Sequence, residues 1–467
     1  MRPGGASSTV AALDPAFIEA AREVFGERLD LREPVRLQHG ASESHFPVAA
    51  PDAVAFAHST ADVVALVRLC ARHRTPLIAY GAGTSVEGNT LPVQGGVSLD
   101  LSGMDAVLRV NAEDMDCTVE AGVRREQLNA HLRDQGLTFP IDPGANATIG
   151  GMAATRASGT NAVRYGTMRE AVLALRVVMP DGRDIQTSRR ARKSAAGYDL
   201  TRLFVGSEGT LGIITEVTLR LHGSPEAIST AVCGFATLAG AVDTVVQAIQ
   251  LGVPLARVEL LDDAQMRAVN AWSKLDYPEV TTLFFEFHGT ELQVREQVGT
   301  VTEIAASNGG SDFQWSNRQE ERSRLWRARH EALYAAKALR PGAVSLITDV
   351  CVPISRLAEC ILQTKLDLKE LPMPATIVGH VGDGNFHVIL MLDPESAEER
   401  KEGERFNEAL VRRALALDGT CTGEHGVGLG KKEFLEQELG DAVDVMRAIK
   451  RALDPNDFLN PGKIFTL

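Results

Sequence analysis

The amino-acid sequence predicts an α+β protein with two main domains that meet near residue 225. Between residues 97 and 221, short strand-like segments alternate with glycine-rich loops, whereas longer helices alternate with strands after Gly223-Ser224-Pro225. Glycine makes up 42 of the 467 residues, which is above the average usage of about 7%. A chain of this length can bury a large core without disulfides or metals. The glycine excess therefore indicates loops in which the backbone approaches a ligand closely.

Apolar spacing and capping residues predict the individual elements. Ser59 can cap a helix in which apolar residues between 63 and 71 recur at intervals of three and four, and Pro76 separates this helix from a buried strand. Val217, Leu219 and Leu221 alternate with polar residues and predict a half-buried strand. Further helices are expected over 239–251, around 319–338 and from about 397 to 417, and further strands over 283–288, near 346–352 and over 375–392. Residues 1–46 are expected to form an N-terminal helical arm.

Charge and composition exclude several functional classes. The formal net charge of −13 argues against a nucleic-acid partner. The longest apolar runs are far shorter than the roughly 18 residues of a transmembrane helix, and the N-terminus resembles neither a secretory signal nor a transit peptide. The six cysteines form no C-x-x-C pair, which fits a reducing compartment and argues against an iron–sulfur cluster in this chain. The protein is therefore expected in the cytoplasm, and peripheral attachment at the inner membrane is left open.

Three glycine-rich loops stand out in the first half of the chain. The first, Gly81–Asn89, follows a strand but fails as a dinucleotide fingerprint, because Val86 replaces the third glycine and no helix follows. The second loop spans residues 142–161 and the third spans 206–215. Successive backbone N–H groups in such loops can bind an anion, although each loop alone could be an ordinary turn. Together they predict a site for a large ligand with a pyrophosphate, and the failed fingerprint argues against NAD.

The order of these loops, with Glu208-Gly209-Thr210-Leu211-Gly212 in the third, resembles the FAD-binding domain of the vanillyl-alcohol oxidase/p-cresol methylhydroxylase (PCMH) class. The resemblance implies a PCMH-type FAD-binding domain over residues 47–224, with the first loop around the FAD pyrophosphate. The loops contain no histidine, so FAD is expected to be bound non-covalently. The cofactor-binding residues that the resemblance implies are Gly81, Ala82, Gly83, Thr84, Ser85, Gly88, Asn89, Pro143, Gly144, Thr148, Ile149, Gly150, Gly151, Ala154, Ser158, Gly159, Glu208, Gly209, Gly212, Ile213, Ile214 and Asn460.

Two histidines flank a predicted hairpin turn in the second half of the chain. Asp383-Gly384 is a strong two-residue turn signal, and a turn there pairs His380 with His387 on one face of the hairpin. Two imidazoles so close can share a divalent metal, although they could also be an incidental surface pair. Glu424, which lies in a second glycine-rich loop, can supply a third ligand. Two histidines and a glutamate with open positions are typical of a catalytic metal site.

The second half also resembles the FAD-linked oxidase C-terminal domain of D-2-hydroxyacid dehydrogenases, and the resemblance covers about residues 45–467. It implies a ferredoxin-like substrate domain with an antiparallel sheet over residues 225–455, and a tail over 456–467 that returns to the flavin. It also implies that His380, His387 and Glu424 hold zinc or manganese, and that His425 is the catalytic base. The segments Trp326–Ala336, Thr348–Pro353 and Cys421–Gly426 are most similar to the D-lactate dehydrogenase (cytochrome) branch of this family.

This resemblance implies an FAD- and metal-dependent oxidation of a D-2-hydroxy monocarboxylic acid, with D-lactate as the expected substrate and hydride transfer to flavin N5. The electrons are expected to pass to a cytochrome, a quinone or an electron-transferring flavoprotein. Arg329 is expected to bind the substrate carboxylate through two parallel N–H groups, although an ion pair on a helix surface is the common alternative. A homodimer is compatible with the sequence.

Three apolar residues favour a substrate with a single carboxylate. In an alignment by eye, Leu333, Ile347 and Ile389 stand where the 2-hydroxyglutarate branch holds a distal carboxylate with polar residues. An unpaired second carboxylate beside these residues would be costly. D-2-hydroxyglutarate dehydrogenase nevertheless stays an alternative, as does the FAD subunit of a glycolate oxidase that works with an iron–sulfur partner. Non-redox alkylglycerone-phosphate synthases and non-catalytic electron-transfer flavoproteins are more distant alternatives.

Overall fold

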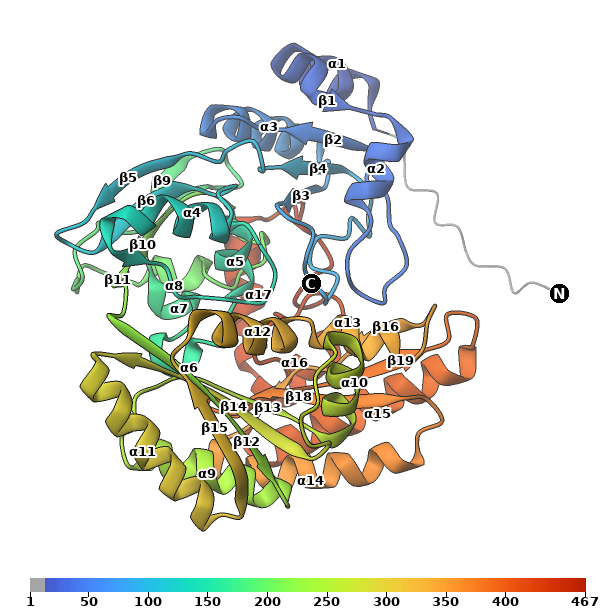
Figure 1. The fold of residues 1–467 in the computed structure, drawn as a ribbon. Coiled ribbons are helices and arrows are strands. Elements are labelled where there is room, and N and C mark those ends of the chain that lie inside the picture. The colour runs from blue at the N-terminus through green and yellow to red at the C-terminus, as the bar shows by residue number, and fades with distance from the viewer. Residues whose placement is uncertain (1–12) are drawn as a thin grey trace.

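The computed structural model describes residues 13–467, which form two lobes, one above the other in Figure 1. The first lobe contains a four-stranded and a five-stranded sheet, a two-stranded sheet joins β7 and β11, and the second lobe contains one eight-stranded sheet. The change from one lobe to the other falls after the short strand β11 (His222–Gly223), near the predicted boundary. The α+β architecture predicted from the sequence is thus confirmed.

The outer sheet of the first lobe has the strand order β1-β2-β4-β3, with parallel pairing of β2 and β3 to β4. Ser59 caps α3 as expected, because its Oγ accepts the N–H of Asp62 at 3.2 Å. The part of the expected N-terminal arm that the structure describes packs on this sheet, and its residues 1–12 lie outside the described range. The elements are α1 (Pro15–Phe25), β1 (Leu29–Asp30), α2 (Glu33–His39), β2 (Ala53–Phe56), α3 (Thr60–His73), β3 (Leu77–Tyr80) and β4 (Val97–Asp100).

The inner sheet of the first lobe is antiparallel, with the order β5-β6-β10-β8-β9. Val217 and Leu219 of β10 are fully buried, which agrees with the predicted alternation. The elements are β5 (Val107–Asn111), β6 (Asp116–Glu120), α4 (Arg125–Leu132), β7 (Leu137–Thr138), α5 (Ile149–Thr155), α6 (Ala162–Tyr165), α7 (Met168–Ala171), β8 (Val172–Val178), β9 (Asp184–Gln186), α8 (Leu200–Phe204) and β10 (Ile213–Arg220). The first glycine-rich loop follows β3, the second follows β7 and contains α5, and the third leads into β10. All three line the cavity between the lobes.

The second lobe is an antiparallel sheet with the order β15-β12-β14-β13-β18-β19-β16, and β17 also pairs with β19. Its strands are β12 (Ala227–Phe235), β13 (Leu255–Leu261), β14 (Thr281–Gly289), β15 (Gly310–Ser316), β16 (Val344–Ile347), β17 (Val350–Cys351), β18 (Ala375–His380) and β19 (Asn385–Leu392). Its helices are α9 (Leu238–Gln250), α10 (Asp263–Ser273), α11 (Glu291–Ser307), α12 (Gln319–His330), α13 (Ala332–Ala338), α14 (Leu357–Asp367) and α15 (Ala397–Ala416).

Each face of this large sheet packs against its own group of helices. Phe285 and Phe287 point to the face covered by α9, α11, α14 and α15, whereas Phe284 between them points to the face covered by α10, α12 and α13. The second group of helices lies between the sheet and the first lobe (Figure 1). Val378 and Ile389 share this inner face, so the alternation of strand residues also turns His380 and His387 toward the first lobe.

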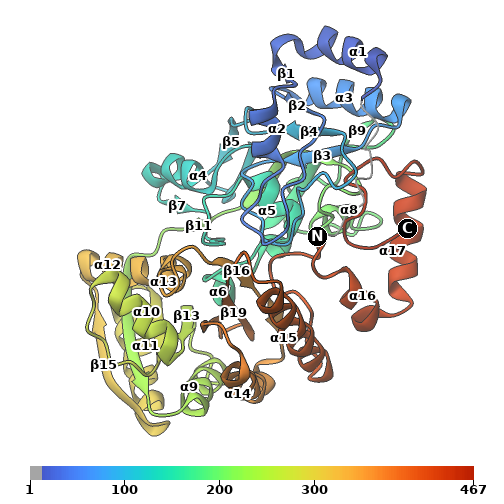
Figure 2. The ribbon, with the colours of Figure 1, turned by 90° about the vertical axis from the view of Figure 1, so that its right-hand side faces the viewer.

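The C-terminal segment crosses back to the first lobe, where α16 (Lys432–Leu439) and α17 (Ala442–Leu453) lie beside α8 (Figure 2). The buried Lys450 ammonium of α17 donates to the backbone oxygens of Thr210 at 2.9 Å and Leu459 at 3.0 Å, and pairs with Asp454. The tail then runs beside β3, where the N–H of Asn460 donates to Leu77 O at 2.9 Å. Helix α17, expected in the substrate domain, therefore packs against the first lobe.

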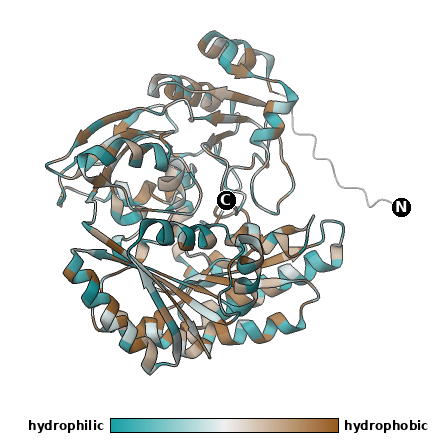
Figure 3. Cartoon of the chain, in the orientation of Figure 1, coloured by the Kyte–Doolittle hydropathy of each residue, from teal (hydrophilic) through white to brown (hydrophobic). Residues whose placement is uncertain are grey.

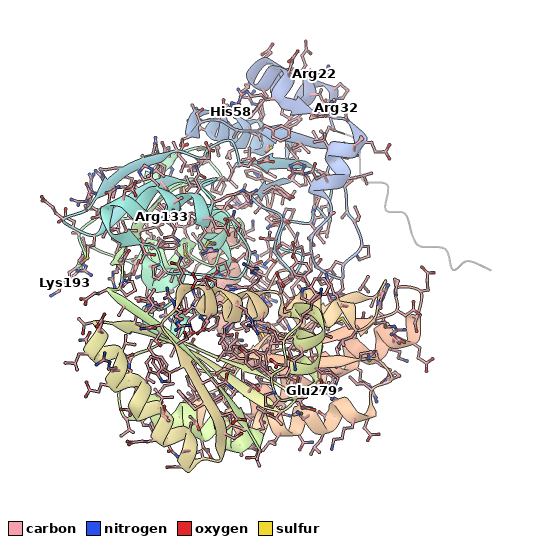
Figure 4. The ribbon with its side chains drawn as sticks, viewed as in Figure 1. Arg22, Arg32, His58, Arg133, Lys193 and Glu279 are labelled. Atoms are coloured by element: carbon pink, nitrogen blue, oxygen red, sulfur yellow. The ribbon has the colours of Figure 1, made fainter. Side chains whose placement is uncertain are left out.

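Apolar and polar residues alternate around the outer helices, as the brown and teal bands of α11 and α15 show (Figure 3). Charged side chains such as Arg133, Lys193 and Glu279 project from the surface (Figure 4). In the part of the chain from residue 13 onward, no helix combines the length and the apolar character needed to cross a bilayer.

Candidate active site

A cavity of about 580 Å³ lies between the two lobes. The first lobe lines it with all three glycine-rich loops, and the second lobe lines it with α12, α13 and the inner faces of β16, β18 and β19. His380, His387, Glu424 and His425 lie in its wall. One cavity thus brings together the loops predicted for the cofactor and the residues predicted for the metal and the base.

Most of the residues predicted to bind the cofactor lie in the wall of this cavity. The lining residues among them are Gly81, Ala82, Gly83, Thr84, Ser85, Asn89, Pro143, Gly144, Thr148, Gly150, Gly151, Ala154, Glu208, Gly209, Gly212 and Ile214. The remaining six, Gly88, Ile149, Ser158, Gly159, Ile213 and Asn460, lie outside the wall. Ile149 and Ile213 are fully buried core residues, and Asn460 donates to Asn89 O at 2.9 Å and to Glu208 O at 2.7 Å. Asn460 therefore joins two of the loops to each other.

The first two loops have small residues and polar groups without protein partners, and a bound dinucleotide requires both. A Cβ on Gly81 would lie 2.3 Å from Thr148 Oγ1, and one on Gly83, which has a φ of +68°, would lie 2.2 Å from the Tyr80 hydroxyl. The buried hydroxyls of Ser85 and Thr160 also line the cavity and have no hydrogen-bond partner among the described residues. A buried polar group without a partner is costly, so these groups fit a ligand that supplies hydrogen bonds. The cradle therefore fits FAD.

The hairpin that carries the two histidines has a longer turn than predicted. Strand β18 pairs with β19 so that His380 lies opposite Asn385 and Val378 lies opposite His387, which leaves residues 381–384 in the turn. The predicted direct pairing of His380 with His387 is therefore wrong. Gly384, with a φ of +80°, is held so close to Val352 O that a Cβ would lie 2.0 Å away, and this contact fixes the wider turn. The observed pairing differs from the predicted pairing by two residues, and a shift of two residues leaves each side chain on the same face of the sheet. Both imidazoles therefore lie on one face, with ring centroids 5.5 Å apart.

The two imidazoles and Glu424 converge on one point. Glu424 Oε1 lies 3.1 Å from His380 Nε2 and 3.2 Å from His387 Nε2, and the three side chains are buried. Each Nδ1 is bonded on its far side: that of His387 donates to Thr348 O at 3.0 Å, and that of His380 donates to the Glu259 carboxylate at 2.7 Å. Both Nε2 atoms therefore point at one carboxylate oxygen. When only Nδ1 of each ring carries a proton, three acceptors meet at this point and need a cation between them, so the donor set fits a divalent metal.

The electrostatics of this cluster agree with that requirement. Burial alone raises the pKa of the Glu424 carboxyl, but the imidazoles of His380 and His387 outweigh it and hold this pKa well below its ordinary value. Burial alone lowers the pKa of His380, but the carboxylates of Glu259 and Glu424 hold it well above its ordinary value. The site therefore favours positive charge between the imidazoles and the carboxylate.

Arg329 lies in the cavity wall but is already paired with a buried carboxylate. Its Nε and Nη2 lie 2.8 and 2.6 Å from Glu259 Oε2, and Glu259 is fully buried. The alternative of an ion pair on a helix surface therefore does not hold. Glu259 was not found from the sequence. The pairing of Leu260 with Gly379, continued by one residue, puts Glu259 opposite His380, and this long-range register leaves no local signal.

His425 stands beside the cluster of His380, His387 and Glu424, and one of its ring nitrogens has no hydrogen-bond partner among the described residues. Its ring stacks on that of His387 with centroids 5.0 Å apart and an interplanar angle of 21°. Its Nδ1 finds no hydrogen-bond partner among residues 13–467 and lies 3.7 Å from the carboxylate of Asp349. Burial lowers the pKa of His425, and Asp349 only partly opposes this effect. The imidazole is therefore neutral near pH 7 and can accept a proton.

The base loop, which is the segment 422–428 that carries Glu424 and His425, is held by one carboxylate from each lobe. Asp349, between β16 and β17, accepts the N–H groups of residues 423–425. Glu208, from the third glycine loop, accepts the N–H groups of Val427 and Gly428 at 2.7 and 2.9 Å. The carboxylate of Glu208, a residue predicted to bind the cofactor, thus bonds to the base loop. The sequence carried no signal for the Asp349 contacts, because they join residues about 75 positions apart.

The three residues predicted to exclude a second carboxylate all line this cavity. Leu333 of α13, Ile347 of β16 and Ile389 of β19 all lie in its wall, near His380 and His387. Val378 completes this apolar stretch. The part of the wall beside His380 and His387 is therefore apolar on one side and carries the guanidinium of Arg329 on another.

The fold and this cavity define a two-domain flavoprotein, and comparisons with known proteins extend that description. The family model for FAD linked oxidases, C-terminal domain, matches residues 224–464, and the model for a FAD binding domain matches residues 51–188. The chain therefore belongs to the FAD-linked oxidases, which makes it an oxidoreductase.

Similar proteins include the probable mitochondrial D-lactate dehydrogenase of Danio rerio, which is 53% identical over 96% of this chain and 92% of that protein. The mitochondrial D-lactate dehydrogenase [cytochrome] of Arabidopsis thaliana is 47% identical over 99% of this chain and 83% of that protein. Among solved structures, p-cresol methylhydroxylase with substrate bound superimposes with a TM-score of 0.79 at 19% identity, over 97% of this chain and 96% of that one. This last likeness confirms the PCMH-type fold.

Proposed function

We propose that the protein is an FAD-dependent dehydrogenase that oxidises D-lactate to the 2-oxo acid with the help of a divalent metal. The observation that carries the proposal is the convergence of His380, His387 and Glu424 in the cavity that the glycine-rich loops also line. The names of the relatives, which are D-lactate dehydrogenases, support the substrate, and the printed word cytochrome supports a cytochrome as electron acceptor. The predicted cytoplasmic location stays a prediction, because the names of the same relatives describe them as mitochondrial.

The residues present fit both groups that this reaction needs. The first two glycine-rich loops would hold FAD, and the triad of His380, His387 and Glu424 would hold zinc or manganese. When bound, FAD supplies an acceptor for the C2 hydride at N5, and the cation supplies a Lewis acid for the hydroxyl oxygen.

His425 would remove the hydroxyl proton of the substrate. Its lowered pKa, its position against the ring of His387 and its Nε2, which lies 3.7 Å from Glu424 Oε1, suit it as a general base next to the cation. Its backbone N–H is fixed by Asp349, so that the ring stays at the cavity wall.

Arg329 would bind the substrate carboxylate with the part of its guanidinium that Glu259 leaves free. Because Nε and Nη2 already contact Glu259, the side around Nη1 is the one that can meet a substrate. Glu259 also holds His380, so one buried carboxylate orients both a proposed metal ligand and the proposed carboxylate-binding group.

We predict that the enzyme prefers D-2-hydroxypentanoate to D-2-hydroxyglutarate. The two acids have the same number of carbons, but only the second carries a distal carboxylate, which would face the apolar side chains of Leu333, Ile347 and Ile389. An unpaired charge in such a place costs several kcal/mol, so we expect kcat/KM to differ by about 100-fold or more. Steady-state kinetics with an artificial acceptor, with D-lactate as reference, measures this ratio. Equal kcat/KM values would reject the proposed selectivity and favour the 2-hydroxyglutarate alternative.

A further inference from the structure

We propose that Asp349 is a positioning residue that fixes Glu424 and His425 relative to the histidines of the hairpin. The inference rests on the proposed function, because it concerns the residues that would hold the metal and act as the base. It adds a role for a side chain that would touch neither substrate, metal nor flavin.

Asp349 organises the base loop through its backbone. One carboxylate oxygen, Oδ2, accepts the N–H groups of Gly423, Glu424 and His425 at 2.9, 2.9 and 3.0 Å, and the hydroxyl of Thr422 at 2.8 Å. Three consecutive amides that converge on one anion form a nest, and this geometry fixes the direction of the peptide planes. Because the amides turn toward Asp349, the positions from which the Glu424 and His425 side chains leave the loop are also fixed.

The approach of the loop to Asp349 is as close as the backbone allows. A Cβ on Gly423 would lie 2.2 Å from Asn385 Nδ2 and 3.0 Å from Asp349 Oδ1. Asn385 in turn donates to Asp349 Oδ1 and to Val350 O, both at 2.8 Å. Glycine at 423 is therefore required by the contact, and Asn385 ties the same contact to the first residue of β19.

The segment around Asp349 also holds the second histidine. Thr348 O accepts the Nδ1–H of His387 at 3.0 Å, and Thr348 Oγ1 accepts the N–H of Val388 at 2.9 Å. Two adjacent residues in the break between β16 and β17 thus orient His387 from one side and Glu424 with His425 from the other. The distance of 3.2 Å between His387 Nε2 and Glu424 Oε1 is set by this segment.

Asp349 is a positioning residue and not a fourth metal ligand. Its carboxylate also lies 3.7 Å from Nδ1 of His387 and 3.7 Å from Nδ1 of His425, in a group of three potential ligands. However, Asp349 is fully buried, and both of its oxygens already accept hydrogen bonds from four backbone or side-chain donors of the loop and from Asn385. Its lone pairs are therefore used within the protein.

Replacement of Asp349 by asparagine tests the inference. The amide keeps the size of the side chain but replaces one acceptor oxygen with a donor that faces the N–H groups of the loop. We expect the FAD-loaded, metal-free D349N protein to bind Zn²⁺ or Mn²⁺ about 10- to 100-fold more weakly than the unsubstituted protein, while its flavin content stays the same. Titration in a chelator-buffered series gives the affinity, and the ligand-field spectrum of the Co²⁺-loaded protein is expected to change.

Asp262 offers a matched control in the same lobe. It is also a buried aspartate that accepts backbone N–H groups, from Gln265 at 2.9 Å and Ile377 at 3.2 Å. We expect D262N to lower the temperature of unfolding and to leave the metal affinity and the Co²⁺ spectrum unchanged. If D349N does not fold, T422V removes a single donor to Asp349 and is expected to weaken metal binding by about 3- to 10-fold.

The outcomes separate the inference from the proposed function. Unchanged metal affinity and an unchanged Co²⁺ spectrum in D349N or T422V, in a protein whose unsubstituted form binds metal, would overturn the role of Asp349 alone. An unsubstituted protein that binds none of these ions would overturn the metal site of the proposed function and the inference with it. An equal loss of affinity in D262N and D349N would show a general loss of structure and would also overturn the inference.

Discussion

Replacing His425 by asparagine is expected to slow the reduction of bound flavin by D-lactate by about 10²- to 10⁴-fold, which is the usual contribution of a general base. The imidazole is neutral near pH 7, its Nε2 lies 3.7 Å from Glu424 Oε1, and its ring stacks against one of the proposed metal ligands. Asparagine has a similar size but cannot take up the proton. Stopped-flow absorbance at 450 nm under anaerobic conditions measures the rate, and the FAD and metal contents are expected to equal those of the unsubstituted protein.

The control for this variant is H131N, which makes the same change on the exposed surface of α4. It should leave the rate unchanged. A rate for H425N within a few-fold of the unsubstituted protein would show that another group accepts the proton.

The same assignment predicts a pH profile. Burial lowers the pKa of His425 below its ordinary value of about 6.5, so the base is already neutral above that pH. The value of kcat/KM for D-lactate should therefore be level above about pH 6.5 and decline at lower pH as the imidazole becomes protonated. H425N should lack this acidic decline.

Replacing Glu424 by glutamine is expected to abolish stoichiometric metal binding and to lower the rate of flavin reduction by about 10³-fold, because loss of a Lewis acid removes several kcal/mol of stabilisation. Glu424 Oε1 is the atom on which both imidazoles converge, and its Oε2 has no hydrogen-bond partner in the described part of the chain. The amide would leave a neutral oxygen or an N–H opposite the imidazoles. Metal analysis of the purified protein and stopped-flow kinetics check both expectations.

The matched control is E436Q on α16, where the glutamate is exposed and paired with Arg447. It should keep metal and rate. Full metal occupancy in E424Q would mean that Glu424 is not a ligand. Full activity in E424Q without metal would mean that the reaction needs none.

The glycine-rich loops and the cluster of His380, His387 and Glu424 could be predicted because most of their signals are local. A run of glycines needs no knowledge of distant strands, and an Asp-Gly turn brings His380 and His387 to one face. That prediction kept the correct face although the pairing was wrong, since a shift of two residues preserves the alternation of a strand.

The residues that support the site could not be predicted in this way. Glu259 reaches His380 because β13 and β18 become neighbours in the sheet, and Asp349 reaches the base loop across about 75 residues. The contact of the Glu208 carboxylate with the N–H groups of Val427 and Gly428 also arises only from the packing of the two lobes. The position of α17 on the first lobe likewise depends on the buried contacts of Lys450, which appear only in the folded chain.

Anaerobic mixing of the FAD-loaded protein with D-lactate and with L-lactate, each with and without a chelator, tests the proposed function most directly. The account predicts that D-lactate bleaches the flavin absorbance at 450 nm, that L-lactate does not, and that prior removal of the metal slows the bleaching by about 10³-fold. Bleaching by L-lactate at the rate of D-lactate, or a rate with D-lactate that does not depend on the metal, would contradict it.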